Sequence, residues 1–264
     1  MKRGLLAFTS DQVAGLRIFF SFIIFIPIIR THIKHLKRKH LKSLLLVGFI
    51  GNAIPAYLFT TAQVHISSSL AGMLNSLTPF FALIIGLVFY RTSSNWLNVL
   101  GVFIGLFGAL GLVVKDFSDI YSGFDKYALL VALATLMYGT SINEIKTNLS
   151  ELSGVTIASL VFLFIGPISG ILLIFSDLQA TYENPLFWSS LFYVFLLALF
   201  SSVIAVVMFN TLIKYTTALF GASVTYIIPI FAIIWGLLDG ETITMMQFLW
   251  ISVIMLGVYL VNKK

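Results

Sequence analysis

Apolar residues in this chain are gathered into long runs that short polar connections separate. A helix needs about 20 apolar residues to cross the roughly 30 Å apolar core of a bilayer, and nine runs approach or reach that length. They lie at 13–29, 44–64, 71–90, 96–114, 127–144, 155–175, 187–212, 219–238 and 245–261. The runs lack the alternation of a membrane barrel and are too long for barrel strands. The pattern predicts an all-α, polytopic membrane bundle with nine visible spans.

The composition points to lipid as the solvent of these helices. Of the 264 residues, 59% are hydrophobic and 10% are charged, whereas an ordinary soluble domain has roughly 25% charged residues. The mean hydropathy is +1.03. A soluble protein of this size could not bury so much apolar surface. The chain has no cysteine, which excludes disulfides and thiolate metal sites.

The distribution of charge predicts an orientation in the membrane. Six of the 16 Lys and Arg residues fall in the connection 30–42, and the positive-inside rule places that connection in the cytoplasm. Alternation of the spans then puts eight of the ten acidic residues outside and the C-terminus in the cytoplasm. The basic connection could also be a lipid or nucleic-acid patch. We favour a topology determinant that also touches anionic headgroups, in a multi-pass protein of the cell (inner) membrane, with the lipid bilayer and no nucleic acid as partner.

The two halves of the chain resemble each other at an offset of 150 residues. Between 79–92 and 229–242, seven of fourteen positions are identical, where chance in apolar sequence gives on the order of one or two. The shared residues of the first copy are Pro79, Phe81, Ala82, Ile84, Gly86, Leu87 and Thr92. Five spans separate equivalent positions, so the copies must lie in opposite orientations. We therefore predict two inverted repeats, 1–118 with four helices and 122–264 with five.

The span at 127–144 has no equivalent in the first copy. Its counterpart would precede Met1, so a five-helix repeat predicts a tenth helix ahead of this sequence. Either this chain is missing that helix or the protein naturally lacks it. We favour the first alternative, because Lys2 and Arg3 are unfavourable at a free external terminus.

Several segments resemble a known family. They are Ala14-Gly15-Leu16-Arg17-Ile18-Phe19 at the start of a helix, Pro79 and Pro229 in the repeated helices, Gly236-Leu237-Leu238-Asp239-Gly240-Glu241-Thr242-Ile243-Thr244, and Gly257-Val258-Tyr259-Leu260. Together with the inverted repeats, they resemble the EamA-like permeases of the drug/metabolite transporter superfamily over essentially the whole chain. The chain departs from the family in lacking its first helix and in having Arg91 where many relatives carry a glutamate. These loose, apolar motifs imply the superfamily and no particular substrate.

Polar residues recur at mid-depth in both copies. Inverted-repeat transporters bind substrate near the midplane, between the copies. The candidate substrate-binding residues are Asn52, Tyr57, Asn75, Thr78, Tyr138, Ser202, Thr225 and Tyr226. The offset pairs Asn52 with Ser202, Asn75 with Thr225 and Ser76 with Tyr226. Each group could instead only hydrogen-bond between helices, which contributes about 0.6 kcal/mol. For the set as a whole, the recurrence favours a shared polar pocket.

Arg17 is the one charge well inside a predicted span. It is either an anion contact for a substrate or an anchor that reaches the outer interface about 9 Å away along the helix; the anchor is the more common use of such a residue. On the span 96–114, Gly101, Gly105 and Gly108 form a small-residue face suited to close helix packing. We expect this span to pack against the span 245–261.

Enzymatic functions fit poorly. The four histidines, His32, His35, His40 and His65, fall in connections or at span ends, and the sequence has no metalloprotease or phosphate-binding motif. We expect no catalytic residues, no cofactor and no metal. All ten acidic residues fall in connections or at span ends, so we expect no carboxylate proton relay.

The sequence predicts a secondary transporter, a permease or exporter that works by alternating access. Its partner would be a small-molecule substrate, such as an amino-acid-like or amphipathic compound. The alternative is a non-transporting membrane receptor or assembly factor, which would have no use for two inverted copies. The chain could act as a monomer or as a homodimer.

Overall fold

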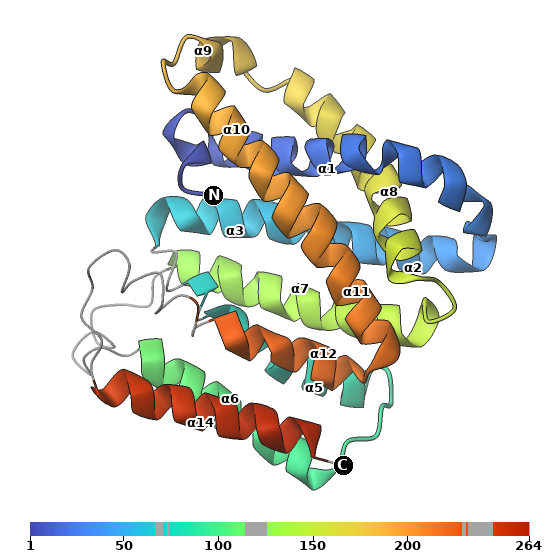
Figure 1. Ribbon diagram of the computed structural model, residues 1–264, viewed down its shortest axis with the longest axis vertical. Helices are drawn as coiled ribbons and strands as arrows, with labels where there is room; N and C mark the ends of the chain where they lie inside the picture. The colour runs from blue at the N-terminus through green and yellow to red at the C-terminus, as the bar shows by residue number, and fades with distance from the viewer. Residues whose placement is uncertain (67–70, 73, 114–125, 229–230, 232–244, 264) are drawn as a thin grey trace. The chain divides into compact units, whose positions relative to one another are not determined.

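The computed structural model describes residues 1–66, 71–72, 74–113, 126–228, 231 and 245–263. Every regular element among these residues is helical (Figure 1). The α-helices are α1 (Ser10–His32), α2 (Arg38–Gly48), α3 (Ile54–His65), α5 (Thr78–Val88), α6 (Trp96–Val113), α7 (Lys126–Asn148), α8 (Gly154–Ile174), α9 (Leu178–Tyr182), α10 (Phe187–Leu197), α11 (Ala205–Tyr215), α12 (Ala218–Ser223) and α14 (Met245–Asn262). This confirms the all-α prediction.

Shorter helical segments of other types lie beside the α-helices. The 3-10 helices are η1 (Gly4–Leu6), η2 (Ile33–His35), η4 (Asn75–Leu77) and η7 (Val224–Ile227). The π-helices are η3 (Phe49–Ala53) and η6 (Ala198–Ile204). Each π-helix continues the α-helices before and after it, so α2–η3–α3 and α10–η6–α11 are two long rods.

Five helical segments are long and apolar enough to cross a membrane: Ser10–His35, Arg38–His65, Lys126–Asn148, Gly154–Ile174 and Phe187–Tyr215. Four shorter apolar segments, Asn75–Val88, Trp96–Gly108, Ala218–Ile227 and Phe248–Val261, match the other predicted spans. A helix thus occurs at each of the nine predicted positions. Pro229 and the family-like segment 236–244 lie outside the described residues.

The chain divides into two compact units, which are considered separately. Unit 1 consists of residues 1–64 and 144–216. In it, α1 packs against α8, and α8 also packs against α2 and α11 (Figure 1). Thr9 and Gln12 form a capping box at the start of α1. The Gln12 side chain also donates a 3.1 Å hydrogen bond to the Asp177 carbonyl, which ties this helix start to the connection after α8.

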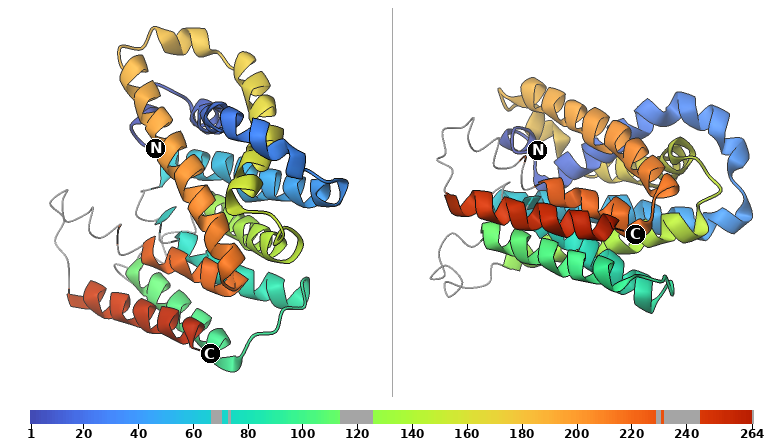
Figure 2. Two further views of the ribbon diagram at one scale, coloured as in Figure 1. Left: turned by 45° about the vertical axis from the view of Figure 1, so that its right-hand side comes forward. Right: turned by 60° about the horizontal axis from the view of Figure 1, so that its bottom comes forward.

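Unit 2 consists of residues 65–143 and 217–264, and α6 and α14 run side by side in it (Figure 2). A Cβ added at Gly101 would lie 2.7 Å from the Val261 nitrogen and 2.8 Å from the Gly257 carbonyl oxygen. At Gly105 it would lie 2.8 Å from the Tyr226 ring, and a Cβ added at Gly257 of α14 would lie 2.5 Å from the Gly105 nitrogen. The glycine face of α6 therefore permits backbone-to-backbone contact with α14. This confirms the predicted pairing of the two spans.

The boundaries of the units differ from those predicted for the repeats. Each unit combines helices from the first half of the sequence with helices from the second half. The predicted division into 1–118 and 122–264 describes two repeats in the sequence. A division of the structure into compact units does not test these repeats, so they stay a prediction.

Candidate functional site

Arg17 contacts the π-helical segment of the long rod α10–η6–α11. Its Nε donates a 2.6 Å hydrogen bond to Oγ of Ser202, which is 2% exposed. Ser202 lies close to the middle of the 29-residue segment Phe187–Tyr215. A serine oxygen is a neutral acceptor, so this bond orients the guanidinium and leaves its positive charge in place. An arginine held in this way can present paired N–H donors to an oxyanion.

The same turn of α1 meets Tyr57 of α3. The Tyr57 hydroxyl oxygen lies 3.4 Å from the place of a Cβ at Gly15. On another side, the Gly15 carbonyl accepts a 3.2 Å hydrogen bond from Ser169 of α8. Because Gly15 has no side chain, α3 and α8 can both come close to this turn. Within unit 1 the structure therefore brings three of the predicted residues, Arg17, Tyr57 and Ser202, to one part of α1.

The two π-helices of unit 1 occupy equivalent positions in the predicted repeats. The offset of 150 residues places 49–53 on 199–203, which lies inside η6. A π-helical turn joins residues five apart by its hydrogen bonds and is frequent at functional sites. An agreement of this kind is independent of the residue identities that suggested the repeat. Both rods of unit 1 thus have a π-helical segment near their centres.

The equivalent residues Asn52 and Ser202 have different partners. Nδ2 of Asn52 donates a 3.0 Å hydrogen bond to the Val47 carbonyl, five residues earlier on the same rod. The amide thus satisfies the backbone where the π-helix disturbs the regular pattern. Ser202 instead accepts the hydrogen bond from Arg17 on another helix. The polar groups at the two π-helices therefore have different partners, and the charged residue, Arg17, contacts the second π-helix, η6.

Unit 2 contains a second pair of equivalent irregularities. The 3-10 helices η4 and η7 contact each other, and the offset places 75–77 on 225–227, inside η7. Oγ1 of Thr78 donates to the Asn75 carbonyl at 2.8 Å, and Oγ1 of Thr225 donates to the Ala222 carbonyl at 2.9 Å. Both hydroxyls thus bond to the backbone of their own helix. Thr78 and Thr225 are not equivalent at the offset of 150, which aligns Thr225 with Asn75, so the predicted polar pocket stays a prediction.

Tyr226 has a packing role that the sequence did not predict. Its side chain is fully buried, and its hydroxyl donates a 3.0 Å hydrogen bond to the Val102 carbonyl of α6. The ring lies against Gly105. Ser76, its equivalent in the first copy, is also fully buried, and its Oγ has no hydrogen-bond partner. Tyr138 is half-buried in α7.

Two titratable residues that the sequence placed at span ends are buried. Glu144 lies one turn inside α7, is 7% exposed and accepts a 2.9 Å hydrogen bond from Nδ2 of Asn148. The apolar run stops at residue 144, but the helix continues with polar residues. His40 lies in the first turn of α2 and is 2% exposed. The helical spacing of His40, Leu44 and Val47, all buried, is the signal that could have placed it on the packed face.

Among the residues that the structure describes, no group of three or more His, Asp or Glu side chains could hold a metal ion. The described site therefore consists of hydroxyl, amide and guanidinium groups. Such groups bind and orient a small polar molecule by hydrogen bonds.

The family model that describes the EamA-like transporter family matches residues 1–114 and 125–263. A protein of Archaeoglobus fulgidus described as an uncharacterized transporter is 26% identical over 126 residues, which are 48% of this chain and 44% of that protein. The match thus spans less than half of this relative. A solved structure described only as the crystal structure of a protein has a TM-score of 0.72 and 14% identity, with 97% of this chain and 88% of that chain covered, which shows the fold alone. By the family match over nearly its whole length, this chain belongs to the EamA-like transporter family.

Proposed function

We propose that this protein is a secondary permease for small polar or amphipathic metabolites of the amino-acid-like type, and that it works by alternating access. The observation that carries the proposal is the hydrogen bond between Arg17 and Ser202, on a turn of α1 whose Gly15 lies next to the Tyr57 hydroxyl. The guanidinium supplies a fixed positive charge for a carboxylate. The Tyr57 ring supplies an apolar face with a hydroxyl at one end, which suits an amphipathic substrate.

The position of this site supports substrate contact over an anchoring role for Arg17. An anchor at the membrane interface extends its charge toward the end of a helix. Arg17 instead bonds to Ser202, which is 15 residues after the first residue of Phe187–Tyr215 and 13 before the last. A charge at this depth is costly and is typically retained for function.

The irregular helical segments, which occur in pairs, support a binding site that takes part in alternating access. Both rods of unit 1 are π-helical near their centres, and unit 2 has paired 3-10 helices. In inverted-repeat transporters, irregular backbone near the midplane forms the binding site and lies at the interface of the repeats. The predicted contacts of Asn52, Asn75, Thr78, Tyr138 and Thr225 with substrate belong to the same proposal, whereas Tyr226, buried against α6, is given a packing role. The proposal also places the protein in the cell membrane. Residues 30–42 and the C-terminus would then face the cytoplasm, as the positive-inside rule predicts.

A counterflow experiment tests this function. The protein is reconstituted into proteoliposomes that are loaded with a mixture of unlabelled amino acids and amphipathic amines, and entry of each labelled compound is measured without ATP. Saturable entry of at least one compound, absent from empty liposomes, is the expected result. If no compound of the panel exchanges, the alternative of a non-transporting receptor or assembly factor becomes the better account.

A further inference from the structure

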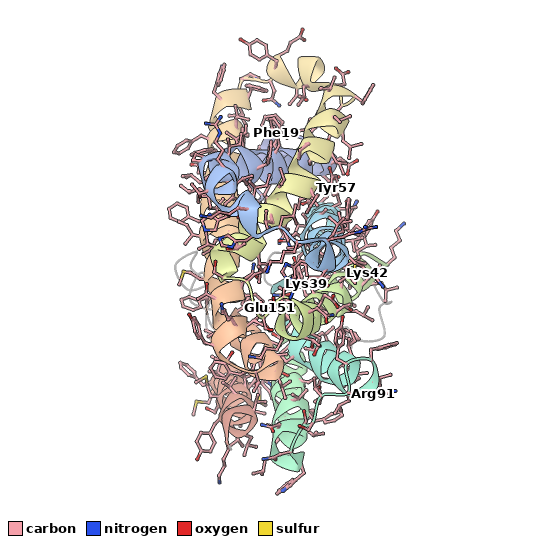
Figure 3. All side chains as sticks on the ribbon, turned by 90° about the vertical axis from the view of Figure 1, so that its right-hand side faces the viewer. Phe19, Lys39, Lys42, Tyr57, Arg91 and Glu151 are labelled. Carbon is pink, nitrogen blue, oxygen red and sulfur yellow. The ribbon has the colours of Figure 1, made fainter. Side chains whose placement is uncertain are left out.

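An ion pair joins two connections of unit 1 that are far apart in sequence. Lys39, in the first turn of α2, places its Nζ 2.6 Å and 2.7 Å from the two carboxylate oxygens of Glu151, in the connection between α7 and α8 (Figure 3). The two side chains are 54% and 60% exposed. An exposed pair of this kind alone contributes little stability. Its importance depends on the residue buried beside it.

That residue is His40, the neighbour of Lys39. Its side chain is 3% exposed, and Nε2 lies 3.5 Å from Oε2 of Glu151. Neither ring nitrogen has a hydrogen-bond partner. A buried polar atom without a partner is unfavourable, so the neutral ring is poorly satisfied here. Protonation would make both nitrogens donors and would place one of them next to a carboxylate.

The other charges around His40 are known from the elements that pack against α2. The elements that pack most extensively against α2 are α8 and η3, and neither contains a titratable residue. On α2 itself, Arg38, Lys39 and Lys42 are cations, and all three are exposed. The carboxylate of Glu151 therefore opposes their repulsion of a charged His40. The Lys39 ammonium, with a smaller contribution from His40, lowers the pKa of the Glu151 carboxyl, so this carboxylate is ionised throughout the range in which histidine titrates.

We propose that His40 is a proton-responsive switch: its protonation completes a His40–Glu151–Lys39 cluster that fastens the connection 30–42 to the connection between α7 and α8, and its deprotonation loosens this attachment. The charged form gains a partner in the attached state, because Nε2 lies 3.5 Å from Oε2 of Glu151, so protonation strengthens the attachment and deprotonation weakens it. Glu151 lies seven residues after Glu144, where the chain passes from unit 2 into unit 1. The three residues of the switch all belong to unit 1, and the switch acts there whatever the substrate is.

Hydrogen–deuterium exchange on the full chain in phosphatidylcholine nanodiscs tests the switch. Exchange of amides 36–44 and 149–156, corrected for the intrinsic rate, is compared at about pH 6 and about pH 7.5, on either side of an ordinary histidine pKa. The variants are His40→Gln and Glu151→Gln. His35→Gln is the matched control, because His35 lies in the same basic connection and is exposed.

We expect both segments of the wild type and of His35→Gln to exchange about fivefold more slowly at the lower pH, the effect of one charge-assisted hydrogen bond of about 1 kcal/mol. His40→Gln and Glu151→Gln should lose this difference. Equal exchange of the wild type at both pH values would overturn the proposal, as would a wild-type response in His40→Gln. If His40→Gln does not fold, Glu151→Gln decides, because it changes only an exposed side chain, and a wild-type response there overturns the proposal equally.

Discussion

The Nε of Arg17 and the Oγ of Ser202 lie 2.6 Å apart although 185 residues separate them in the sequence. One residue comes from the first helix of the chain, and the other from the π-helical centre of a rod in the second half. Because the side chain of Ser202 is buried, the guanidinium has a defined direction relative to η6. This contact thus joins a charge on α1 to the centre of the second rod within unit 1.

Removal of the Ser202 hydroxyl should therefore weaken substrate binding. Ser202→Ala leaves Arg17 charged but without this orienting bond, and we expect the half-saturating substrate concentration in counterflow to rise about tenfold, as for loss of a hydrogen bond to a charged group. Ser201→Ala is the control, since it removes the adjacent hydroxyl of the same π-helix. Equal effects of the two substitutions would indicate a general disturbance of η6.

A substitution at Tyr226 tests whether this residue packs within unit 2 or contacts substrate. Its hydroxyl bonds to the Val102 carbonyl inside unit 2, so Tyr226→Phe should lower the free energy of unfolding by about 1–2 kcal/mol and leave transport unchanged. Thermal unfolding in detergent and counterflow are measured on the same preparations. Wild-type thermal stability combined with lost transport would instead return Tyr226 to the substrate-binding set.

The contact between α6 and α14 should tolerate no added methyl group at Gly101. A Cβ there meets backbone atoms of Val261 and Gly257 at 2.7–2.8 Å, and backbone cannot rotate away. We expect Gly101→Ala to destabilise unit 2 by about 1–3 kcal/mol, seen as a lower midpoint of thermal unfolding. At Gly72 the Cβ would be 3.3 Å from a methyl group of Ile228, so Gly72→Ala is the control and should unfold near the wild-type temperature.

A substitution at Glu144 tests whether a carboxylate in these helices carries protons during transport. The sequence places all ten carboxylates in connections or at span ends, but Glu144 is buried within α7. Its hydrogen bond with Asn148, in the last turn, ties it to the end of that helix, and we still predict facilitative or exchange-driven transport. An imposed pH gradient should therefore not accelerate flux. Acceleration that Glu144→Gln abolishes would identify this carboxylate as a proton carrier and contradict the prediction.

The helices could be predicted because lipid imposes a length and a composition on every span. The glycine face of α6 was also recognisable, since Gly101, Gly105 and Gly108 lie on one face of a helix. The π-helices were not: the sequences of η3 and η6 are ordinary apolar helix, and the extra residue in their turns has no local signal. Apolar runs also marked the helix ends wrongly at Glu144, where polar residues continue α7.

The candidate site was predicted as a list of polar residues without their partners. The repeat placed Asn52 and Ser202 at equivalent positions, but it could not tell that one bonds to its own backbone and the other to Arg17. That difference depends on which helices cross, and such contacts join residues far apart in the chain. The burial of His40 was not predicted for a related reason. Its sequence neighbours are basic and indicated a polar connection, whereas the structure places His40 on the packed face of α2.

Counterflow with a matched pair of compounds tests the central claim most directly. Labelled phenylalanine and labelled phenylalanine amide differ in the carboxylate, and each is offered to proteoliposomes of the wild type, Arg17→Lys and Arg17→Gln. Arg17 as a carboxylate contact predicts that the wild type prefers the acid, that Arg17→Gln loses this preference by about tenfold or more, and that Arg17→Lys is intermediate. A wild type that transports both compounds, with a preference that Arg17→Gln leaves unchanged, would contradict it.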